Sequence, residues 1–214
     1  MQIKTKVLTA DNTNRVVFDV LAVPLIDEAL DDDCWIAGGF ARQVAHAILI
    51  EQKTELEWNQ YLGTAPRPKN SVSRFGDIDV FLSSNQTHEE LLVLANTDYR
   101  SRRSLAGFAQ DARCLFNKQL ISVQLVTFEN FRYPGIAACF SGFDICNSQY
   151  AISKSGGNYI LHWTPNALAA DIQKSVKVRN NESPFLGSRI LKYMTERGCE
   201  NGITDDSGTL VKDW

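Results

Sequence analysis

The chain has 214 residues, a formal net charge of −3 at pH 7 and a hydrophobic fraction of 44%. This length allows one large domain, or a domain with a small appendage, and it suffices to bury a core without disulfides or metals. The near-neutral charge excludes a global basic field that would attract polyanions. Any nucleic acid would therefore have to be held by a local patch.

Cysteine usage and the lack of long apolar runs bear on location. The five cysteines are scattered, and none lies in a CxxC pair. We interpret them as buried, reduced thiols of a cytoplasmic protein, the alternatives being a zinc site or a disulfide framework. The histidines at 46, 88 and 162 share no metal-binding spacing. No stretch resembles a signal peptide or reaches the roughly 18 apolar residues of a membrane span, so we expect a soluble protein without membrane contact.

The N-terminal third of the chain alternates between helical and strand patterns. Apolar residues at helical spacing predict a helix over residues 16–30, kinked or divided at Pro24. The apolar stretch 34–37 predicts a short strand that ends in two glycines, and an alanine-rich helix follows over 40–51. Residues 59–76 are rich in glycine and proline and are interpreted as a long loop, which is usually functional at that length.

The middle of the chain contains a strand with carboxylates, a helix and a basic segment. The strand is expected at 77–83. Thr87 and Glu90 form a capping-box pattern that starts a helix through about Ala95. Residues 98–107 are polar and contain three arginines, for which we favour a solvated loop over phosphate contacts.

Further strands and two helix starts follow. A hairpin is expected over 112–127, and a second pair of strands over 143–153 and 159–163. Thr164-Pro165 and Ser183-Pro184 are both an N-cap residue followed by proline, which is typical of a helix start.

Together these elements predict an α+β fold, with a mixed twisted sheet and flanking helices on one side. Residues 1–163 would form the head, and residues 164–214 a short C-terminal helical extension that packs on it.

Asp77 and Asp79 are the first candidates for chemistry. At positions i and i+2 of a strand their side chains point to the same face, so both carboxylates can reach one point. Two carboxylates so placed repel each other unless a cation holds them, and hard oxygen ligands favour Mg²⁺ or Mn²⁺. The alternative is a pair of solvated residues on an edge strand.

Gly38 and Gly39 are the second candidates, because they separate a strand from a helix. Glycines there allow the backbone to approach a phosphate, and the helix N-terminus offers N–H groups and a partial positive charge. Glycine pairs also serve merely as tight turns.

The order strand, Gly-Gly, helix, loop and DxD strand resembles the nucleotidyltransferase superfamily of the DNA polymerase β-like kind. The stretch from Ile36 to Arg42 looks like the GGxxR start of the tRNA nucleotidyltransferase and poly(A) polymerase head domain, and the stretch from Phe75 to Phe81 looks like its metal-binding strand. The segment from Phe143 to Tyr193 also resembles phage-encoded members with this head. The chain departs from the pattern by the long insertion between Gly39 and the DxD strand, which leaves the substrate open.

The resemblance implies a fold, a site and an activity. A hydroxyl would attack the α-phosphorus of a nucleoside triphosphate while two Mg²⁺ or Mn²⁺ ions, held by Asp77, Asp79 and a third carboxylate, stabilise the attacking and leaving oxygens. We choose Asp144 as the third carboxylate, with Asp111 as its competitor.

Other contacts to the substrate are expected around these residues. Gly38 and Gly39 would cradle the triphosphate, with Arg42 and Arg74 as further phosphate ligands and Lys69 as another candidate. Aromatic candidates for stacking on a base are Tyr61, Phe75, Tyr99 and Trp163.

The acceptor is left open among an RNA 3′ end such as that of tRNA, a small molecule and a protein hydroxyl. Two alternatives remain: a catalytically inactive nucleotide- or RNA-binding protein of the same fold, and a toxin- or defence-type transferase that modifies tRNA or protein.

Overall fold

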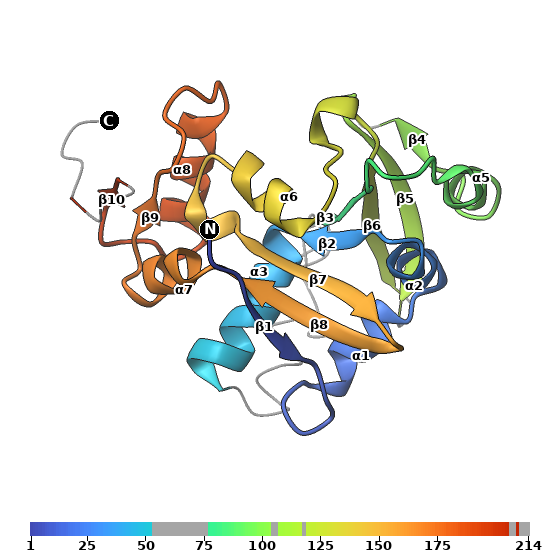
Figure 1. Cartoon of the computed structure of the whole chain (residues 1–214), viewed down its shortest axis with the longest axis horizontal. Helices are drawn as coiled ribbons and strands as arrows, with labels where there is room; N and C mark the ends of the chain where they lie inside the picture. The colour runs from blue at the N-terminus through green and yellow to red at the C-terminus, as the bar shows by residue number, and fades with distance from the viewer. Residues whose placement is uncertain (53–76, 104–106, 117–118, 206–208, 210–214) are drawn as a thin grey trace.

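The structure is a computed structural model that describes residues 1–52, 77–103, 107–116, 119–205 and 209 (Figure 1). It confirms the α+β class: within the described residues an open, eight-stranded mixed sheet has the order β1-β8-β7-β2-β3-β6-β5-β4. The strands of this sheet are β1 (Lys4–Val7), β2 (Trp35–Ala37), β3 (Asp77–Phe81), β4 (Arg102–Arg103), β5 (Ala109–Phe116), β6 (Gln119–Val126), β7 (Tyr150–Ser155) and β8 (Asn158–Trp163).

Helices cover both faces of the sheet, so the expectation that they lie on one side is wrong. The larger core lies under four helices, whereas a smaller one, which includes Trp35 and Phe140, lies on the opposite face under α6 (Ile136–Gly142). The helices over the larger core are α1 (Arg15–Leu21), α2 (Pro24–Asp31), α3 (Gly39–His46) with its π-helical continuation η1 (Ala47–Glu51), and α5 (Glu89–Thr97).

The register of the central strands determines which side chains meet. β2 pairs antiparallel with β3, and β3 pairs parallel with β6. Ile78 and Val80 are fully buried in the larger core. The alternating residues Asp77, Asp79 and Phe81 therefore point to the opposite face, toward α6.

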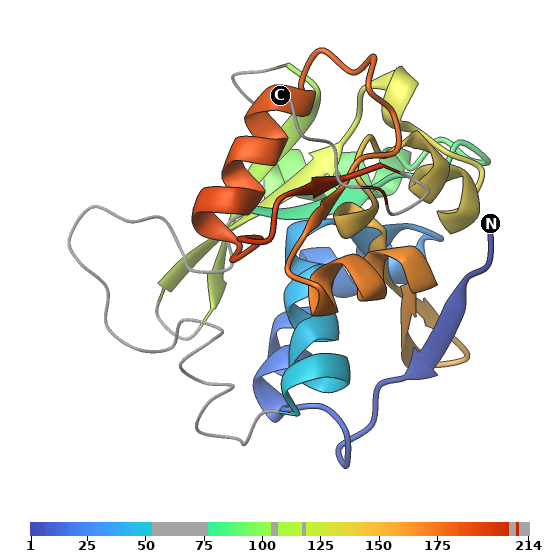
Figure 2. The same cartoon turned by 90° about the vertical axis from the view of Figure 1, so that its left-hand side faces the viewer.

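The C-terminal segment forms a small unit with a core of its own. It contains the helices α7 (Pro165–Ile172) and α8 (Leu186–Glu196). The strand β9 (Val176–Lys177), between the two helices, pairs in parallel with β10 (Ile203–Thr204), which follows α8. The sequence did not reveal this small sheet. The core of the unit includes Ile190 of α8 and also Ile145 from the part assigned to the head. Figure 2 shows α7 beside α3, so the C-terminal unit packs on the head.

Several expected boundaries are confirmed, because local chemistry fixes them. Pro24 begins α2, and the Thr164 hydroxyl accepts a hydrogen bond from the Ala167 N–H at the start of α7. Gly198 follows the end of α8 with a φ of 72°.

Other expected boundaries are wrong. The capping box at Thr87 is not formed, since α5 begins after His88, whose backbone is left-handed. α8 begins at Leu186 rather than at Pro184. The strand expected from 143 begins only at Tyr150, after the 3₁₀ turn η3 (Cys146–Ser148). No described helix is long and apolar enough to cross a membrane.

Candidate functional site

A cavity of about 610 Å³ opens where the ends of β2 and β3 meet α8. Its wall brings Gly38, Gly39, Asp77 and Asp79 together, although the two pairs are far apart in the sequence. The antiparallel register of β2 and β3 explains this, because the end of β2 lies beside the start of β3. Ala37, the last residue of β2, also lines the cavity, and its small side chain leaves the carboxylates accessible.

The glycine turn has the geometry that a close backbone approach requires. Gly38 has φ 78° and ψ −130°, a conformation that strongly favours glycine. Its N–H donates to the Tyr150 carbonyl, and its own carbonyl accepts from the Arg42 N–H as the first hydrogen bond of α3. The helix N-terminus and its partial positive charge are thereby fixed at the cavity wall.

Asp77 and Asp79 form the acidic part of the cavity. Asp77 is exposed, and Asp79 is half-buried. Desolvation, followed by the negative charge of Asp77, raises the pKa of Asp79 to about 7, although Lys192 and Arg189 oppose the rise. Of the described residues that line the cavity, these two alone carry carboxylates.

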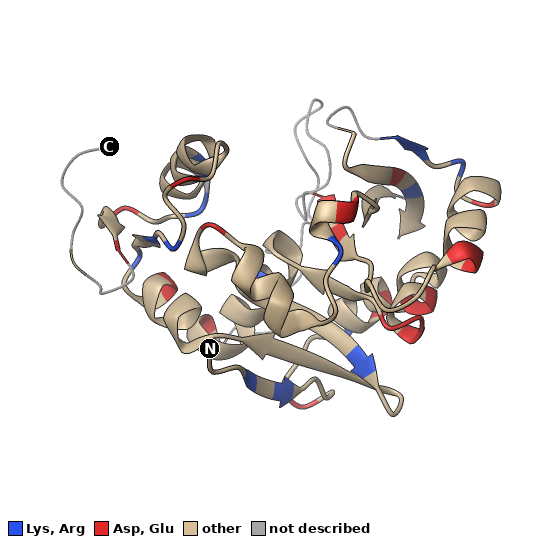
Figure 3. Cartoon of the chain, turned by 45° about the horizontal axis from the view of Figure 1, so that its top comes forward, with Lys and Arg blue, Asp and Glu red and all other residues tan. Residues whose placement is uncertain are grey.

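Helix α8 supplies positive charge opposite the carboxylates. Arg189, Lys192 and Arg197 all line the cavity (Figure 3 shows basic positions along α8). Arg189 and Lys192 share one side of the helix because they are three residues apart, and Arg197 follows the last residue of α8. A Cβ atom placed on Gly39 would lie 3.6 Å from a guanidinium nitrogen of Arg197. Arg197 therefore sits directly over the glycine turn.

Asp144 does not take the role expected for it. It lies in a bend rather than on a strand, and it does not line the cavity. Its Oδ1 accepts a hydrogen bond from Arg189 Nη1 at 2.5 Å, while its buried Oδ2 has no described hydrogen-bond partner. Because Arg189 reaches the cavity and Asp144 is 3% exposed, the carboxylate orients the arginine rather than joining the acidic pair.

The neighbouring strand does not supply a third carboxylate either. Ser122 and Gln124 of β6 stand opposite Asp77 and Asp79. Asp111 lies one strand further away, about 10 Å from Asp79 at the usual strand spacing. It is already engaged, since its Oδ1 accepts from the Ser122 hydroxyl at 2.5 Å. Sequence spacing alone could not show that β3 lacks a neighbouring carboxylate, because tertiary packing determines which strand lies beside β3.

Arg42 is not a phosphate ligand, because its guanidinium is buried in an ion pair. Its Nη2 lies 2.9 Å from Asp171 of α7, and the side chain is 4% exposed. Asp171 also accepts hydrogen bonds from Asn147 and Tyr150, and its Oδ2 lies 2.7 Å from His46 Nε2. We call these five residues the Asp171 cluster.

The Asp171 cluster contacts the cavity wall through Arg42 and Tyr193. Burial would raise the pKa of Asp171, but His46 and Arg42 outweigh it and lower the pKa. The Arg42 guanidinium lies 5.1 Å from the centre of the Tyr193 ring, which is part of the cavity wall. The arginine of the GGxxR pattern thus positions α7 and α8 rather than a phosphate.

Aromatic side chains form the apolar wall of the cavity. Tyr133 packs directly against Gly142, where any side chain would collide with the ring. Phe81 contacts both Tyr133 and Phe143 with ring centroids 6.4 and 5.9 Å apart. The remaining aromatic lining residues are Phe108, Phe131, Phe185 and Tyr193.

The described aromatic candidates, Tyr99 and Trp163, and the basic segment at 102–103 lie away from this wall. Tyr99 and Trp163 pack against the larger core instead. Arg102 and Arg103 form β4 at the edge of the sheet. The other candidates, Arg74, Lys69, Tyr61 and Phe75, lie outside the described residues, as does the loop 59–76.

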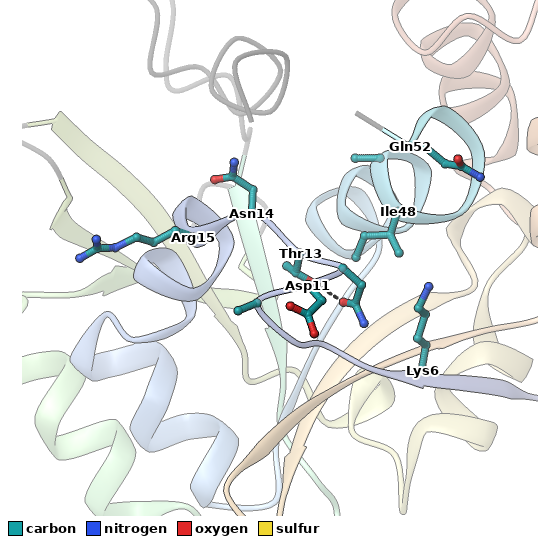
Figure 4. A pocket seen from close by; sticks show the side chains of 10 residues that line it. Lys6, Asp11, Thr13, Asn14, Arg15, Ile48 and Gln52 are labelled. Carbon is teal, nitrogen blue, oxygen red and sulfur yellow. Dashed lines mark hydrogen bonds between the residues drawn. The ribbon is translucent and has the colours of Figure 1, made fainter. Parts of the chain in front are cut away.

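A second cavity, of about 460 Å³, lies between the β1–α1 loop and η1. Figure 4 shows Lys6, Asp11, Asn14 and Gln52 around it. Among its described lining residues there is one carboxylate and no aromatic side chain, which makes it a weaker candidate for nucleotide chemistry.

Comparison with known proteins adds no assignment, since no family model and no curated protein matches the chain.

Proposed function

We propose that the chain is a metal-dependent nucleotidyltransferase, which moves a nucleoside monophosphate from a nucleoside triphosphate to an acceptor hydroxyl. One observation carries this proposal: a glycine turn at a helix N-terminus, a paired carboxylate and three cationic side chains line the same cavity. The glycine turn and the cationic side chains suit phosphate binding, and the paired carboxylates suit divalent cations.

The paired carboxylates fit the metals that the proposal requires. Asp77 and Asp79 offer hard oxygens on one face of β3. Burial first, and the charge of Asp77 second, raise the pKa of Asp79, which supports a site whose negative charge a cation would neutralise. Bound Mg²⁺ or Mn²⁺ ions would neutralise that charge and lower the barrier to attack by the acceptor hydroxyl.

The protein's own residues then bind and orient the triphosphate. Gly38, Gly39 and Arg197 surround the expected position of the phosphates, and Lys192 and Arg189 offset their charge. The acceptor hydroxyl releases its proton to water, and its oxygen forms a bond to the α-phosphorus. The bond from that phosphorus to the oxygen that bridges it to the β-phosphorus breaks, and pyrophosphate leaves. The aromatic wall around Tyr133 and Phe143 offers stacking partners for the base.

A second candidate is a nucleotide- or RNA-binding protein that keeps the fold without transfer. It is favoured by Ser122 and Gln124, which stand where β6 would present a third carboxylate to the pair. A toxin- or defence-type transferase would share the first proposal's chemistry and differ only in its acceptor, tRNA or protein. All five cysteines are buried thiols, which supports a cytoplasmic location for either candidate.

The test combines binding with transfer. The protein is incubated with each α-labelled nucleoside triphosphate, with Mg²⁺ or Mn²⁺, and with total RNA or a protein pool. We expect label on one acceptor class with the parent and with Asp19→Asn, an exposed control on α1, but none with Asp79→Asn.

Calorimetry with the same four nucleotides separates the candidates. Binding without any transfer would support the non-catalytic protein. A folded protein that binds none of the four would contradict the transferase and the nucleotide-binding form of the second candidate. RNA binding by that protein would then identify the RNA-binding form.

A further inference from the structure

A second group of ligand-forming side chains lies at the other end of β2 and β3. Asp32 follows α2, Cys34 precedes β2, and His88 precedes α5. One ligand atom from each lies within 4.8 Å of the other two. Because β2 and β3 are antiparallel, the start of β2 and the end of β3 are remote from Gly38 and Asp77, so this cluster is separate from the cavity.

The cluster is not built as a nucleophile. Cys34 is 2% exposed, which denies a substrate access to its sulfur. Burial, the largest effect on it, also raises the pKa of the thiol to about 12.

His88 is held so that one ring nitrogen faces the other two residues. Its Nε2 lies 2.9 Å from the Ser83 carbonyl oxygen, which accepts a hydrogen bond from it. Its Nδ1 lies 2.5 Å from Asp32 Oδ2 and 3.6 Å from Cys34 Sγ. A backbone carbonyl that fixes the far nitrogen is the usual support of a metal-binding histidine.

The backbone and a neighbouring amide reinforce this placement. His88 has a φ of 57°, which is uncommon for a residue other than glycine and persists only where the surroundings enforce it. The Gln86 amide donates to the carbonyl and carboxylate oxygens of Asp32, at 2.6 and 2.7 Å.

A carboxylate oxygen and a ring nitrogen this close need a positive charge between them, either a proton or a metal ion. The position of the Cys34 sulfur favours a metal ion over a proton. Bond lengths of about 2.3 Å to sulfur and 2.0–2.1 Å to nitrogen at a tetrahedral ion separate the two ligand atoms by about 3.6 Å. The separation of Cys34 Sγ from His88 Nδ1 is 3.6 Å. Asp32 Oδ2 lies at a hydrogen-bond distance of 2.5 Å from Nδ1, and it must move to about 3.4 Å from Nδ1 when the ion takes the place of the proton between them.

We propose that Asp32, Cys34 and His88 bind a zinc-class transition-metal ion. Sulfur, imidazole and carboxylate together suit zinc better than Mg²⁺. The Asp32 side chain is 35% exposed, so an ion can enter there and a solvent molecule can complete the coordination. The ion fastens the α2–β2 turn to the β3–α5 loop and stabilises the folded chain, which alone presents the three ligands together.

Cobalt(II) tests the site, because it binds zinc sites and reports a thiolate ligand by charge-transfer absorption. Full-length protein is stripped of metal and titrated with Co²⁺. We expect a thiolate band that saturates at one equivalent and that one equivalent of Zn²⁺ abolishes. The same ion should raise the melting temperature.

Variants assign the band to these ligands. Cys34→Ser should lose it, whereas Cys114→Ser, a control at another fully buried thiol, should keep it. His88→Asn, in which asparagine tolerates the left-handed backbone, should weaken Co²⁺ binding at least tenfold. Asp77→Asn/Asp79→Asn should keep the band, which makes the result independent of the proposed transferase activity.

Two outcomes would overturn the proposal. One is a parent protein, shown to be folded, that gives no thiolate band at several equivalents of Co²⁺; a proton then holds Asp32 to His88. The other is a band that survives Cys34→Ser, since it would then belong to another cysteine.

Discussion

Asp79 combines two conditions that rarely coexist at a structural position: partial burial and a like-charged neighbour two residues away. Burial and the charge of Asp77 together raise its pKa to about 7. A structural aspartate in this sheet behaves differently, since Asp111 accepts a hydrogen bond from Ser122 and lies within 4.0 Å of two arginines. This contrast supports the proposal that Asp79 binds a ligand rather than stabilising the fold.

This pKa makes a prediction for metal-free protein. A carboxyl whose pKa is higher in the folded than in the unfolded chain favours folding while it is protonated, and that contribution is lost as pH rises from about 4 to about 7. Denaturant unfolding in EDTA should show stability falling across this range, and Asp79→Asn should flatten the fall. Asp19→Asn, an exposed control, should leave it unchanged. A parent whose stability does not fall between these pH values would contradict the prediction.

The four candidate residues that line one cavity could be predicted because their sequence patterns are local. The glycine pair and the DxD pair each need only neighbours in the sequence to be recognised, and the cavity brings both together. Arg42 and Asp144 could not be judged in this way. Arg42 forms an ion pair with Asp171, and Asp144 forms one with Arg189. The local sequence does not reveal ion pairs between residues so far apart in the chain.

At the scale of elements, α8 matters most to the site. The sequence predicted that the C-terminal extension, which contains α8, packs on the head. One face of α8 packs into the C-terminal core through Leu186 and Ile190, and its basic residues line the cavity. Arg197, at the end of the helix, was missed because its meaning depends on where the helix lies.

We predict that the basic side of α8 supplies much of the affinity for a triphosphate. Lys192→Ala and Arg197→Ala should each weaken nucleotide binding by roughly tenfold, since a hydrogen bond to a charged group contributes about 1.5–3 kcal/mol. Lys174→Ala, which removes an exposed lysine paired with Glu200, is the matched control. Calorimetry at two salt concentrations measures the effect. Unchanged affinity in both cavity variants would exclude α8 from the phosphate site.

The Asp171 cluster joins α3, β7 and α7, so its loss should be felt in stability rather than in chemistry. Asp171→Asn leaves the Arg42 charge buried and unpaired, which should cost about 3–5 kcal/mol of unfolding free energy. Arg42→Met/Asp171→Asn should recover part of that loss. Denaturant unfolding of the two variants provides the comparison, and equal loss in both would contradict the ion-pair explanation.

At the scale of the whole molecule, the fold class and most elements followed from the sequence, but their arrangement did not. Strands β2, β3, β5, β6 and β8 were expected near their observed positions. β3 pairs with β6, and Asp144 lies in a bend before β7. Packing between distant segments sets both features, and this is why the sequence alone could not place Asp144 relative to Asp77 and Asp79. The short strands β1, β9 and β10 carry too little pattern to be recognised alone.

The last prediction concerns the folded molecule as a binder of cations. A ligand that binds only the folded chain stabilises it by ~2.7 kcal/mol at about 100 times its Kd, which corresponds to roughly 5–10 °C in melting temperature for a chain of this size. Mn²⁺ should produce such a shift in the parent, and Asp77→Ala or Asp79→Ala should abolish it. Without metal, either variant should be at least as stable as the parent, because each substitution relieves the repulsion that raises the pKa of Asp79.

This combination of signs distinguishes a ligand site from a structural one. If the carboxylates served the fold, each alanine variant would lose about 1–3 kcal/mol with or without metal. Thermal melts of the parent and both variants, with and without Mn²⁺, separate the cases. Equal Mn²⁺ shifts in all three proteins would mean that the cation binds elsewhere. The acidic pair would then have no part in metal binding, and the transferase proposal would lose its chemical basis.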